Sequence, residues 1–309
     1  RHDNVENARL LMQKIEKLKV KLKKPDLKFD VVAHSMGGLI ARYAAMYGKT
    51  DLTEKPSPNW SGAKHFDKIF LLGTPNEGSM DALETLSEGY SINSIAGRIH
   101  PKFLNREVGF TSPALFQLLP HGNSARFYDE NLKPLLLDIY DVKTWQKYSW
   151  AITSDEAFLK KQSKSKKVQI EQYFAAVLLR AKRFHQALDV KTKVPISLNF
   201  YSFGSDCENT LDGAIVYFDS EKGKWKTLMR GDSFKTASGE KVSEELVKQT
   251  IFSKGDGTVS KRSLLAQNMF AIEATSPFQT IVCENHRKIA SNKMVQETLT
   301  TILTSKPLK

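Results

Sequence analysis

The sequence predicts an α/β fold: a mostly parallel sheet flanked by helices and interrupted by a mostly helical insertion. Helix-like and strand-like segments alternate over residues 4–73. The pattern turns helical, with many Lys, Phe and Trp residues, near residue 80, and strands return at residue 195. We therefore expect a sheet core formed by residues 1–79 and 195–309, and a helical cap formed by residues 80–194.

The first half of the predicted core follows from hydrophobic periodicity. Apolar residues recur every three or four positions over residues 4–24, which predicts a helix that ends at Pro25. Residues 28–34 are rich in β-branched side chains and predict a buried strand, residues 37–47 a second helix, and residues 66–72 a second strand. A helix between two such strands implies a right-handed βαβ unit and a parallel sheet.

The second half of the core has weaker but similar signals. Residues 196–203 predict a strand, residues 215–218 and 225–229 a hairpin, and residues 278–283 a further strand. Residues 292–304 predict a closing helix. The sheet core is therefore expected to resume after the cap and to contain all of these elements.

Charge and cysteine content restrict the partners. The 309 residues carry a formal net charge of +12, which favours anionic partners such as an anionic membrane surface. No nucleic acid is expected, because the lysine clusters at residues 14–28 and 160–167 lack the aromatic pattern of a nucleic-acid module. No apolar run is long enough to span a bilayer. The oligomeric state is left open.

Cys207 and Cys283 have no metal-ligand spacing. Both lie near the ends of predicted strands, so they are interpreted either as neighbours or as two ordinary thiols. We expect two ordinary thiols, which favours a reducing compartment such as the cytoplasm.

A serine between the first strand and the following helix carries the chemistry. Ser35 occupies the centre of Ala33-His34-Ser35-Met36-Gly37-Gly38, in the strand–turn–helix context of a nucleophile elbow. Ala33 and Gly37 supply the small side chains that such a tight turn requires. The helix that begins after Ser35 directs its first amides toward a developing oxyanion, and the Met36 amide is the expected donor. Ser35 is therefore the predicted nucleophile of an α/β-hydrolase.

A serine nucleophile needs a base and an orienting acid, which follow it in the order Ser, Asp or Glu, His in this fold. His286 follows the last predicted strand and is the expected base. None of the other six histidines has that placement, and His34 is expected to face away from the tip of the elbow. Asp206, after the strand at 196–203, and Asp256, between two glycines, are both candidates for the acid, and spacing alone leaves the choice open.

The chain resembles the lecithin:cholesterol acyltransferase-like family of α/β-hydrolases, which includes lipases, phospholipases and acyltransferases. The resemblance rests on residues 32–43 around the elbow, Leu72-Gly73-Thr74-Pro75-Asn76-Glu77-Gly78-Ser79, residues 112–120, Asp138-Ile139-Tyr140-Asp141 with Trp145, Gly255-Asp256-Gly257-Thr258-Val259, and His286. In that family the aspartate of the Gly-Asp-Gly-Thr-Val loop is the catalytic acid. The resemblance therefore implies a triad of Ser35, Asp256 and His286.

Two functional hypotheses follow. The first is a serine-dependent hydrolase or O-acyltransferase that acts on lipid or related acyl esters through an acyl-enzyme, with neither a cofactor nor a metal. Apolar cap residues would then cover the acyl pocket: Phe103, Leu115, Phe116, Leu118, Leu119, Trp145 and Trp150. The second is a non-catalytic binding or interaction module that keeps the fold without the chemistry.

Only one helix precedes the strand of the nucleophile, although a doubly wound sheet normally places that strand near its middle. We therefore expect the first strands of the fold to be missing from this sequence. The missing part would supply the second oxyanion donor and cover an otherwise open sheet edge.

Overall fold

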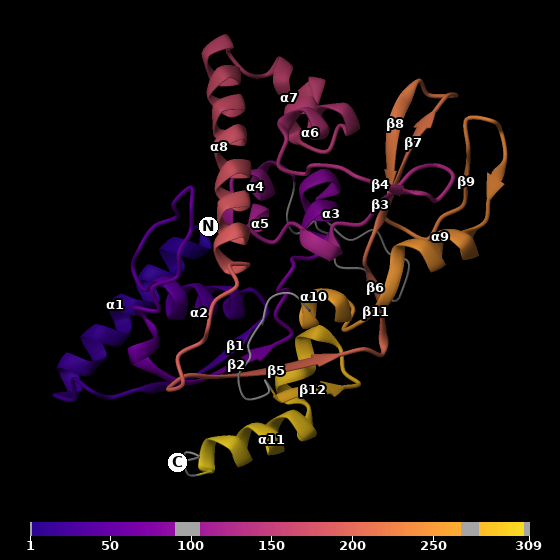
Figure 1. The fold of residues 1–309 in the computed structure, drawn as a ribbon. Coiled ribbons are helices and arrows are strands. Elements are labelled where there is room, and N and C mark those ends of the chain that lie inside the picture. The colour runs from indigo at the N-terminus through magenta and orange to yellow at the C-terminus, as the bar shows by residue number, and fades with distance from the viewer. Residues whose placement is uncertain (1, 90–105, 267–277, 306–309) are drawn as a thin grey trace. The chain divides into compact units, whose positions relative to one another are not determined.

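The computed structural model describes residues 2–89, 106–266 and 278–305, and its chain divides into two compact units (Figure 1). The sheet unit comprises residues 2–77, 183–210 and 254–309. The insertion unit comprises residues 78–182 and 211–253. Each unit is described by itself below, and Phe103 of the predicted acyl pocket lies outside the described residues.

The sheet unit is built on four parallel strands in the order β1-β2-β5-β12. The helices α1 and α2 lie on one side of this sheet and α11 lies on the other (Figure 1). The strands, helices and 3-10 turns of the unit are α1 (Asn4–Leu22), β1 (Phe29–His34), α2 (Met36–Tyr47), η1 (Ala63–His65), β2 (Phe66–Leu72), β5 (Asn199–Ser205), α10 (Lys261–Leu265), β12 (Phe278–Val282), η4 (His286–Ser291) and α11 (Lys293–Thr304). The predicted fold class, a parallel sheet flanked by helices, is confirmed.

The predicted helix at residues 4–24 is α1, and its ends have clear local causes. The side chain of Asp3 accepts a hydrogen bond from the Glu6 amide and so caps the N-terminus. The helix ends two residues before the predicted boundary because Lys23 adopts a left-handed conformation, with φ 53°, and its amide turns back to the carbonyls of Lys19 and Val20.

One face of the sheet packs against α11 and η4 through a small apolar core. Its buried members come from three strands and both helical elements: Phe70, Leu72, Phe203, Val282, Ile289 and Val295. The core lies directly beneath the carboxyl ends of β2, β5 and β12. It therefore fixes the strand ends from which the functional loops depart.

The nucleophile strand β1 differs from the buried strand that its sequence predicts. Its side chains alternate between partly covered and exposed, and Val32 is 52% exposed. Among the described residues, β1 pairs only with β2, so it is the end strand of the sheet. An end strand has one face and one edge less well covered than a central strand, which accounts for the difference.

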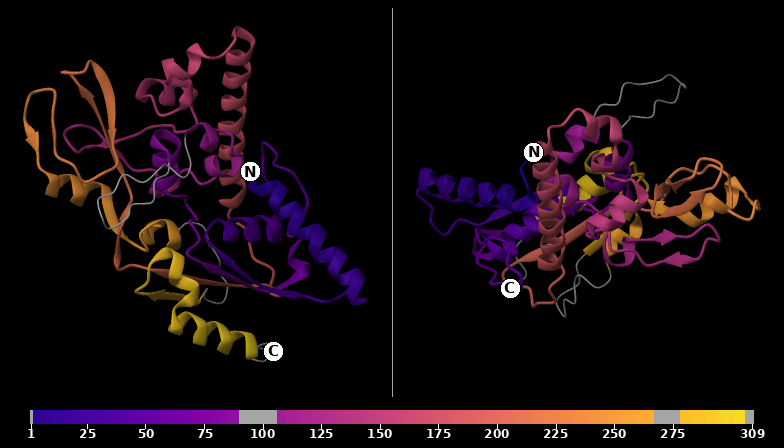
Figure 2. Two further views of the ribbon diagram at one scale, coloured as in Figure 1. Left: turned by 180° about the vertical axis from the view of Figure 1, so that it is seen from behind. Right: turned by 90° about the horizontal axis from the view of Figure 1, so that it is seen from above.

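The insertion unit is held together by a large aromatic cluster that includes Phe116, Trp145, Trp150 and Phe174. Its elements in chain order are α3 (Met80–Glu88), α4 (Arg106–Phe110), α5 (Pro113–Phe116), η2 (Gly122–Ser124), β3 (Phe127–Tyr128), β4 (Pro134–Leu135), α6 (Val142–Tyr148), η3 (Ile152–Ser154), α7 (Glu156–Lys160), the first part of the long α8 (Lys164–Leu188), β7 (Ala214–Asp219), β8 (Lys224–Leu228), β9 (Phe234–Lys235), β10 (Lys241–Val242) and α9 (Glu244–Ile251). Strands β4, β3, β7 and β8 form a sheet in that order, and β9 pairs with β10. Figure 2 shows the same elements from behind and from above.

The two units divide the chain differently from the prediction. The predicted sheet core took in the whole of residues 195–309, whereas residues 211–253 belong to the insertion unit. The reason is packing: Ile215 and Val216 of β7 and Val247 and Ile251 of α9 join the aromatic cluster. The predicted cap ran to residue 194, whereas residues 183–194 belong to the sheet unit. The chain passes between the units after Glu77, within α8 after Lys182, and within β6 (Glu208–Leu211) and β11 (Phe252–Gly255), which pair in a two-stranded sheet.

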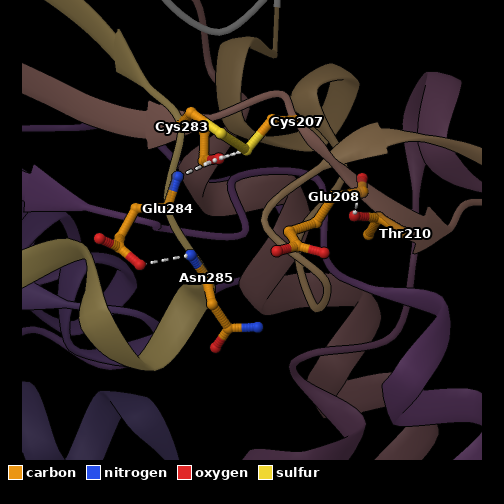
Figure 3. The surroundings of a disulfide bond; sticks show 7 residues. Cys207, Glu208, Thr210, Cys283, Glu284 and Asn285 are labelled. Atoms are coloured by element: carbon orange, nitrogen blue, oxygen red, sulfur yellow. Dashed lines mark hydrogen bonds between the residues drawn. A yellow bond between two sulfur atoms is a disulfide. The ribbon is translucent and has the colours of Figure 1, made fainter.

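Cys207 and Cys283 form a disulfide, with their Cα atoms 5.3 Å apart (Figure 3). The prediction of two ordinary thiols is therefore wrong, and the expectation of a reducing compartment loses its basis. The strands β5 and β12 are hydrogen-bonded neighbours, so the segments that follow them start side by side. The cross-link spans 76 residues of sequence, and a closed loop of that size stabilises a folded chain by about 4 kcal/mol in the chain-entropy model.

Within the described residues, no helix is both long enough and apolar enough to cross a bilayer.

Candidate active site

Ser35 occupies the sharp turn between β1 and α2. Its backbone is strained, with φ 57° and ψ −132°, which is unusual for a residue with a side chain. The Ser35 amide donates a hydrogen bond to the Leu72 carbonyl at 2.8 Å and so continues the pairing of β1 with β2. The turn is thereby held rigidly above the edge of the sheet, as a nucleophile elbow requires.

The closest approach at the elbow is at Gly38, one residue beyond the predicted Gly37. A Cβ atom at Gly38 would collide with the side chain of Thr74, whereas one at Gly37 would lie 3.9 Å from the Ala33 side chain, an ordinary contact. The close approach of α2 to the loop after β2 therefore requires a glycine at position 38.

The structure brings the three predicted triad residues together. The Ser35 hydroxyl lies 2.9 Å from Nε2 of His286, within reach to donate a hydrogen bond. On the other side of the ring, Nδ1 of His286 lies 2.7 Å from Oδ2 of Asp256. Asp256 is 2% exposed and His286 is 7% exposed, so water screens the acid–base contact only weakly. Serine, imidazole and carboxylate thus form one hydrogen-bonded row.

The loop of Asp256 presents its carboxylate in a fixed orientation. Oδ1 accepts hydrogen bonds from the amides of Val259 and Thr258, at 2.7 and 3.0 Å. These bonds leave Oδ2 for the imidazole. Gly257 has φ 88°, a conformation that favours glycine and lets the loop turn back tightly enough to place both amides.

The loop of His286 is docked onto the acid loop through its backbone as well. The His286 amide donates to the Asp256 carbonyl at 2.8 Å. Asn285 caps η4 by accepting a hydrogen bond from the Arg287 amide, so that the ring of His286 departs from the first residue of a fixed helical turn. Two independent bonds between Asp256 and His286 therefore set the position of the imidazole.

Asp206, the other candidate for the acid, faces a different partner. Its Oδ2 accepts a hydrogen bond from the Lys261 ammonium at 2.7 Å. That hydrogen bond holds the pKa of the Asp206 carboxyl below its ordinary value. Asp206 thus forms an ion pair with Lys261 at the surface, whereas Asp256 is the carboxylate that contacts the imidazole of His286.

Met36 is the first residue of α2, and the amides of a helix's first turn have no hydrogen-bond acceptor within the helix. Its amide is thus available above the elbow for a negative oxygen, and the positive end of the helix dipole adds to the attraction.

The middle of α2 is anchored by the buried Arg42. Its guanidinium donates to Oδ1 of Asn76 at 3.2 Å and to the Leu188 carbonyl at 2.9 Å. Burial lowers the pKa of Arg42 to about 10, although the nearby Asp189 opposes the shift. The side chain remains a cation at neutral pH and fixes the helix whose N-terminus faces the site.

Two residues at the site were missed by the sequence interpretation. His34 does not face away: its Nε2 donates to the His286 carbonyl at 2.9 Å, and the two rings lie 4.8 Å apart. Gly73 has φ 57°, and a Cβ there would lie 3.1 Å from Nδ1 of His286 and 3.2 Å from Oδ2 of Asp256. The Leu-Gly-Thr-Pro motif carried a signal for Gly73, whereas the sequence has no signal for the direction of the His34 side chain.

No group of three or more His, Cys, Asp or Glu residues within the described ranges could hold a metal ion.

The parallel sheet with a strained serine between strand and helix is the architecture of an α/β-hydrolase. The chain belongs to the lecithin:cholesterol acyltransferase family, whose model matches residues 1–205. No curated protein matches the chain.

Among solved structures, a chain in the crystal structure of the Tle4–Tli4 complex is similar, with a TM-score of 0.57 and 13% identity over 96% of this chain. This chain covers 64% of the length of that structure's chain. The Bacillus licheniformis lipase BlEst2 in its mature form has a TM-score of 0.40 and 13% identity, covering 98% of this chain and 75% of its own. The likeness to the first structure shows the fold, in agreement with the family.

Proposed function

We propose that the protein is a serine-dependent acyl hydrolase or O-acyltransferase that acts on esters of lipids or related acyl compounds. The observation that carries the proposal is the hydrogen-bonded row from Ser35 through His286 to Asp256. Membership of the lecithin:cholesterol acyltransferase family supports the ester chemistry and the lipid class of the substrate.

In the proposed reaction, the Ser35 hydroxyl attacks the ester carbonyl while Nε2 of His286 takes its proton. The carbonyl π electrons move to oxygen, where the Met36 amide stabilises the negative charge. Collapse of this intermediate breaks the bond to the alcohol, which leaves with the proton from His286. An acyl ester on Ser35 remains, and water or an acceptor alcohol releases the acyl group through the same steps in reverse.

Asp256 supports both proton transfers without accepting a proton itself. Its carboxylate holds the tautomer in which Nδ1 carries hydrogen, and stabilises the imidazolium that forms during the attack. Because backbone amides fix the other oxygen of Asp256, the carboxylate cannot rotate away from the ring without losing two hydrogen bonds.

A fluorophosphonate probe tests the proposal, because it labels a serine only where a base activates the hydroxyl. The full-length protein should be labelled at Ser35 and should hydrolyse a p-nitrophenyl acyl ester. The Ser35→Ala variant should bind no probe and lose hydrolysis by a factor on the order of 10⁴ to 10⁶, with its melting temperature unchanged. A protein that is folded but unreactive toward the probe would instead favour a non-catalytic binding module.

A further inference from the structure

A short segment that starts at the last residue of β5, residues 205–210, contacts both of the loops that carry Asp256 and His286. We call it the clamp segment. It begins at the carboxyl end of β5 and runs into β6, and Figure 3 shows it beside the segment that follows β12. From the sequence, Asp206 was the only residue of this segment to which a catalytic role was considered. Two of its other side chains, those of Cys207 and Thr210, contact the loops of His286 and Asp256 directly.

The clamp segment is covalently joined to the loop of His286. Cys207 is bonded to Cys283, which lies three residues before His286. A second bond reinforces the link, because the Glu284 amide donates to the Ser205 hydroxyl at 3.1 Å. Figure 3 shows the disulfide with Glu284 and Asn285, which follow Cys283 in the chain.

The same segment holds the loop of Asp256 through a buried hydroxyl. Thr210 is fully buried, and its Oγ1 accepts a hydrogen bond at 2.9 Å from the amide of Gly257, the residue after Asp256. The hydroxyl also donates to the Glu208 carbonyl within the clamp segment, which fixes its rotamer. A segment of six residues therefore grips one loop at Thr210 and the other at Cys207.

We propose that the clamp segment is a positioning element for the Asp256–His286 pair, and that the disulfide makes the activity sensitive to reduction. The inference rests on the proposed function. Both cysteines are exposed, so a thiol reductant can reach the bond. Reduction removes the only covalent tie between the base loop and the clamp segment within the described residues. The loop then keeps only hydrogen bonds, which break and re-form readily.

The redox step involves two electrons and needs a dithiol as the co-reactant. A thiolate of the dithiol attacks one cysteine sulfur, the S–S bond breaks, and a mixed disulfide forms. The second thiol of the reductant then displaces the remaining cysteine. Cys207 and Cys283 become thiols by gaining two electrons and two protons, and the reductant leaves as its own disulfide.

The expected effect of reduction falls on turnover. Displacing a catalytic group by about 1 Å costs on the order of a hundredfold in rate, so we expect kcat to fall about tenfold to a hundredfold. KM should change much less, because a displaced His286 slows proton transfer in the chemical step and leaves the binding of the ester unchanged. A disulfide that only stabilised the fold would lower the melting temperature and leave kcat unchanged below it.

The test compares oxidised full-length protein with the same protein in dithiothreitol, at a temperature well below both melting transitions. We would measure kcat and KM on a p-nitrophenyl ester, and record the proton NMR signal of the His286 Nδ1–H beside Asp256. Reduction should lower kcat and weaken that signal, and reoxidation should restore both. The Cys207→Ser/Cys283→Ser double variant should match the reduced protein and be insensitive to dithiothreitol.

A second arm uses Thr210 and does not depend on cysteine chemistry. Thr210→Val keeps the shape but removes the acceptor for the Gly257 amide, so kcat should fall, whereas Thr210→Ser should keep most of it. Thr236→Val provides the matched control, because Thr236 is also a buried threonine with a hydroxyl that accepts a backbone hydrogen bond, from Glu240 in the insertion unit. It should leave kcat unchanged.

The outcomes separate this inference from the proposed function. If oxidised protein hydrolyses the ester and reduced protein does so at the same kcat, with the His286 signal intact, the inference is overturned and the proposed function stands. If oxidised protein neither hydrolyses esters nor reacts with fluorophosphonate, the proposed function fails. The His286 signal still decides in that case whether the disulfide positions the ring.

Discussion

Replacing Asp256 with asparagine should disable the base while leaving the site almost unchanged in shape. One oxygen of Asp256 accepts hydrogen bonds from the Val259 and Thr258 amides, and the other faces Nδ1 of His286. The amide oxygen of an asparagine must occupy the first position, because an NH₂ group there would face two N–H donors. Its NH₂ group is therefore directed at Nδ1 of His286.

A donor at that position reverses the tautomer of His286. Nδ1 must accept, so the ring hydrogen moves to Nε2, which then cannot take the proton of Ser35. The same substitution in a serine protease triad lowers kcat about 10⁴-fold, which corresponds to about 5.4 kcal/mol of transition-state stabilisation at 1.36 kcal/mol for each factor of ten. We expect a loss of this size in kcat and little change in KM.

The assay is hydrolysis of a p-nitrophenyl ester by wild-type protein, Asp256→Asn and Asp206→Asn. Asp206→Asn is the matched control, because it makes the same chemical change in a carboxylate that pairs with Lys261 instead of the base. It should keep nearly full activity. Retention of more than about a tenth of wild-type kcat by Asp256→Asn, or a larger loss in Asp206→Asn, would refute the assignment of the acid.

Two further predictions concern a glycine and a buried histidine. Gly73→Ala should lower kcat at least tenfold, because the new methyl group would lie 3.1 Å from Nδ1 of His286 and displace the ring. Gly223→Ala is the matched control: Gly223 has a similar φ of 60°, and a Cβ there would meet no atom within 4 Å, so this variant should lose stability and keep its kcat. Burial, with the nearby charges of Lys19 and Lys64, holds the pKa of His65 below its ordinary value of 6.5. The folded state therefore prefers the neutral imidazole, and the stability that this gives is present above pH 6.5 and is lost as the pH falls through the lowered pKa. The melting temperature of the wild-type protein should therefore fall further between pH 7.5 and pH 5 than that of His65→Gln. An equal fall in the two proteins would contradict the reasoning.

The strongest local patterns predicted the sheet side of the fold. The apolar run at residues 66–72 is β2 with the predicted boundaries, and α2 differs from its prediction by one residue. The strand–turn–helix context of Ser35 and the position of His286 after the last strand selected two residues that the structure brings together. The choice of Asp256 over Asp206 needed the family resemblance, because both aspartates lie in plausible loops.

What the sequence did not predict depends on which elements become neighbours. The disulfide requires that β5 and β12 pair, and nothing in either strand specifies its neighbour. Residues 211–253 were assigned to the sheet core because an amphipathic hairpin can cover either unit; the aromatic cluster that it joins forms only in three dimensions. The turn of His34 onto His286 likewise depends on a loop that returns from 252 residues away.

That long separation also governs when the protein acquires its chemistry. Ser35 and its base are 251 residues apart, and ribosomes add about 5 to 20 residues per second. The serine is therefore added to the chain about 13 to 50 s before the histidine. During that interval its hydroxyl has no base and is no better a nucleophile than any other serine. On the proposed mechanism, a nascent chain cannot cleave acyl esters until the carboxyl-terminal strand joins the sheet and brings His286 to Ser35.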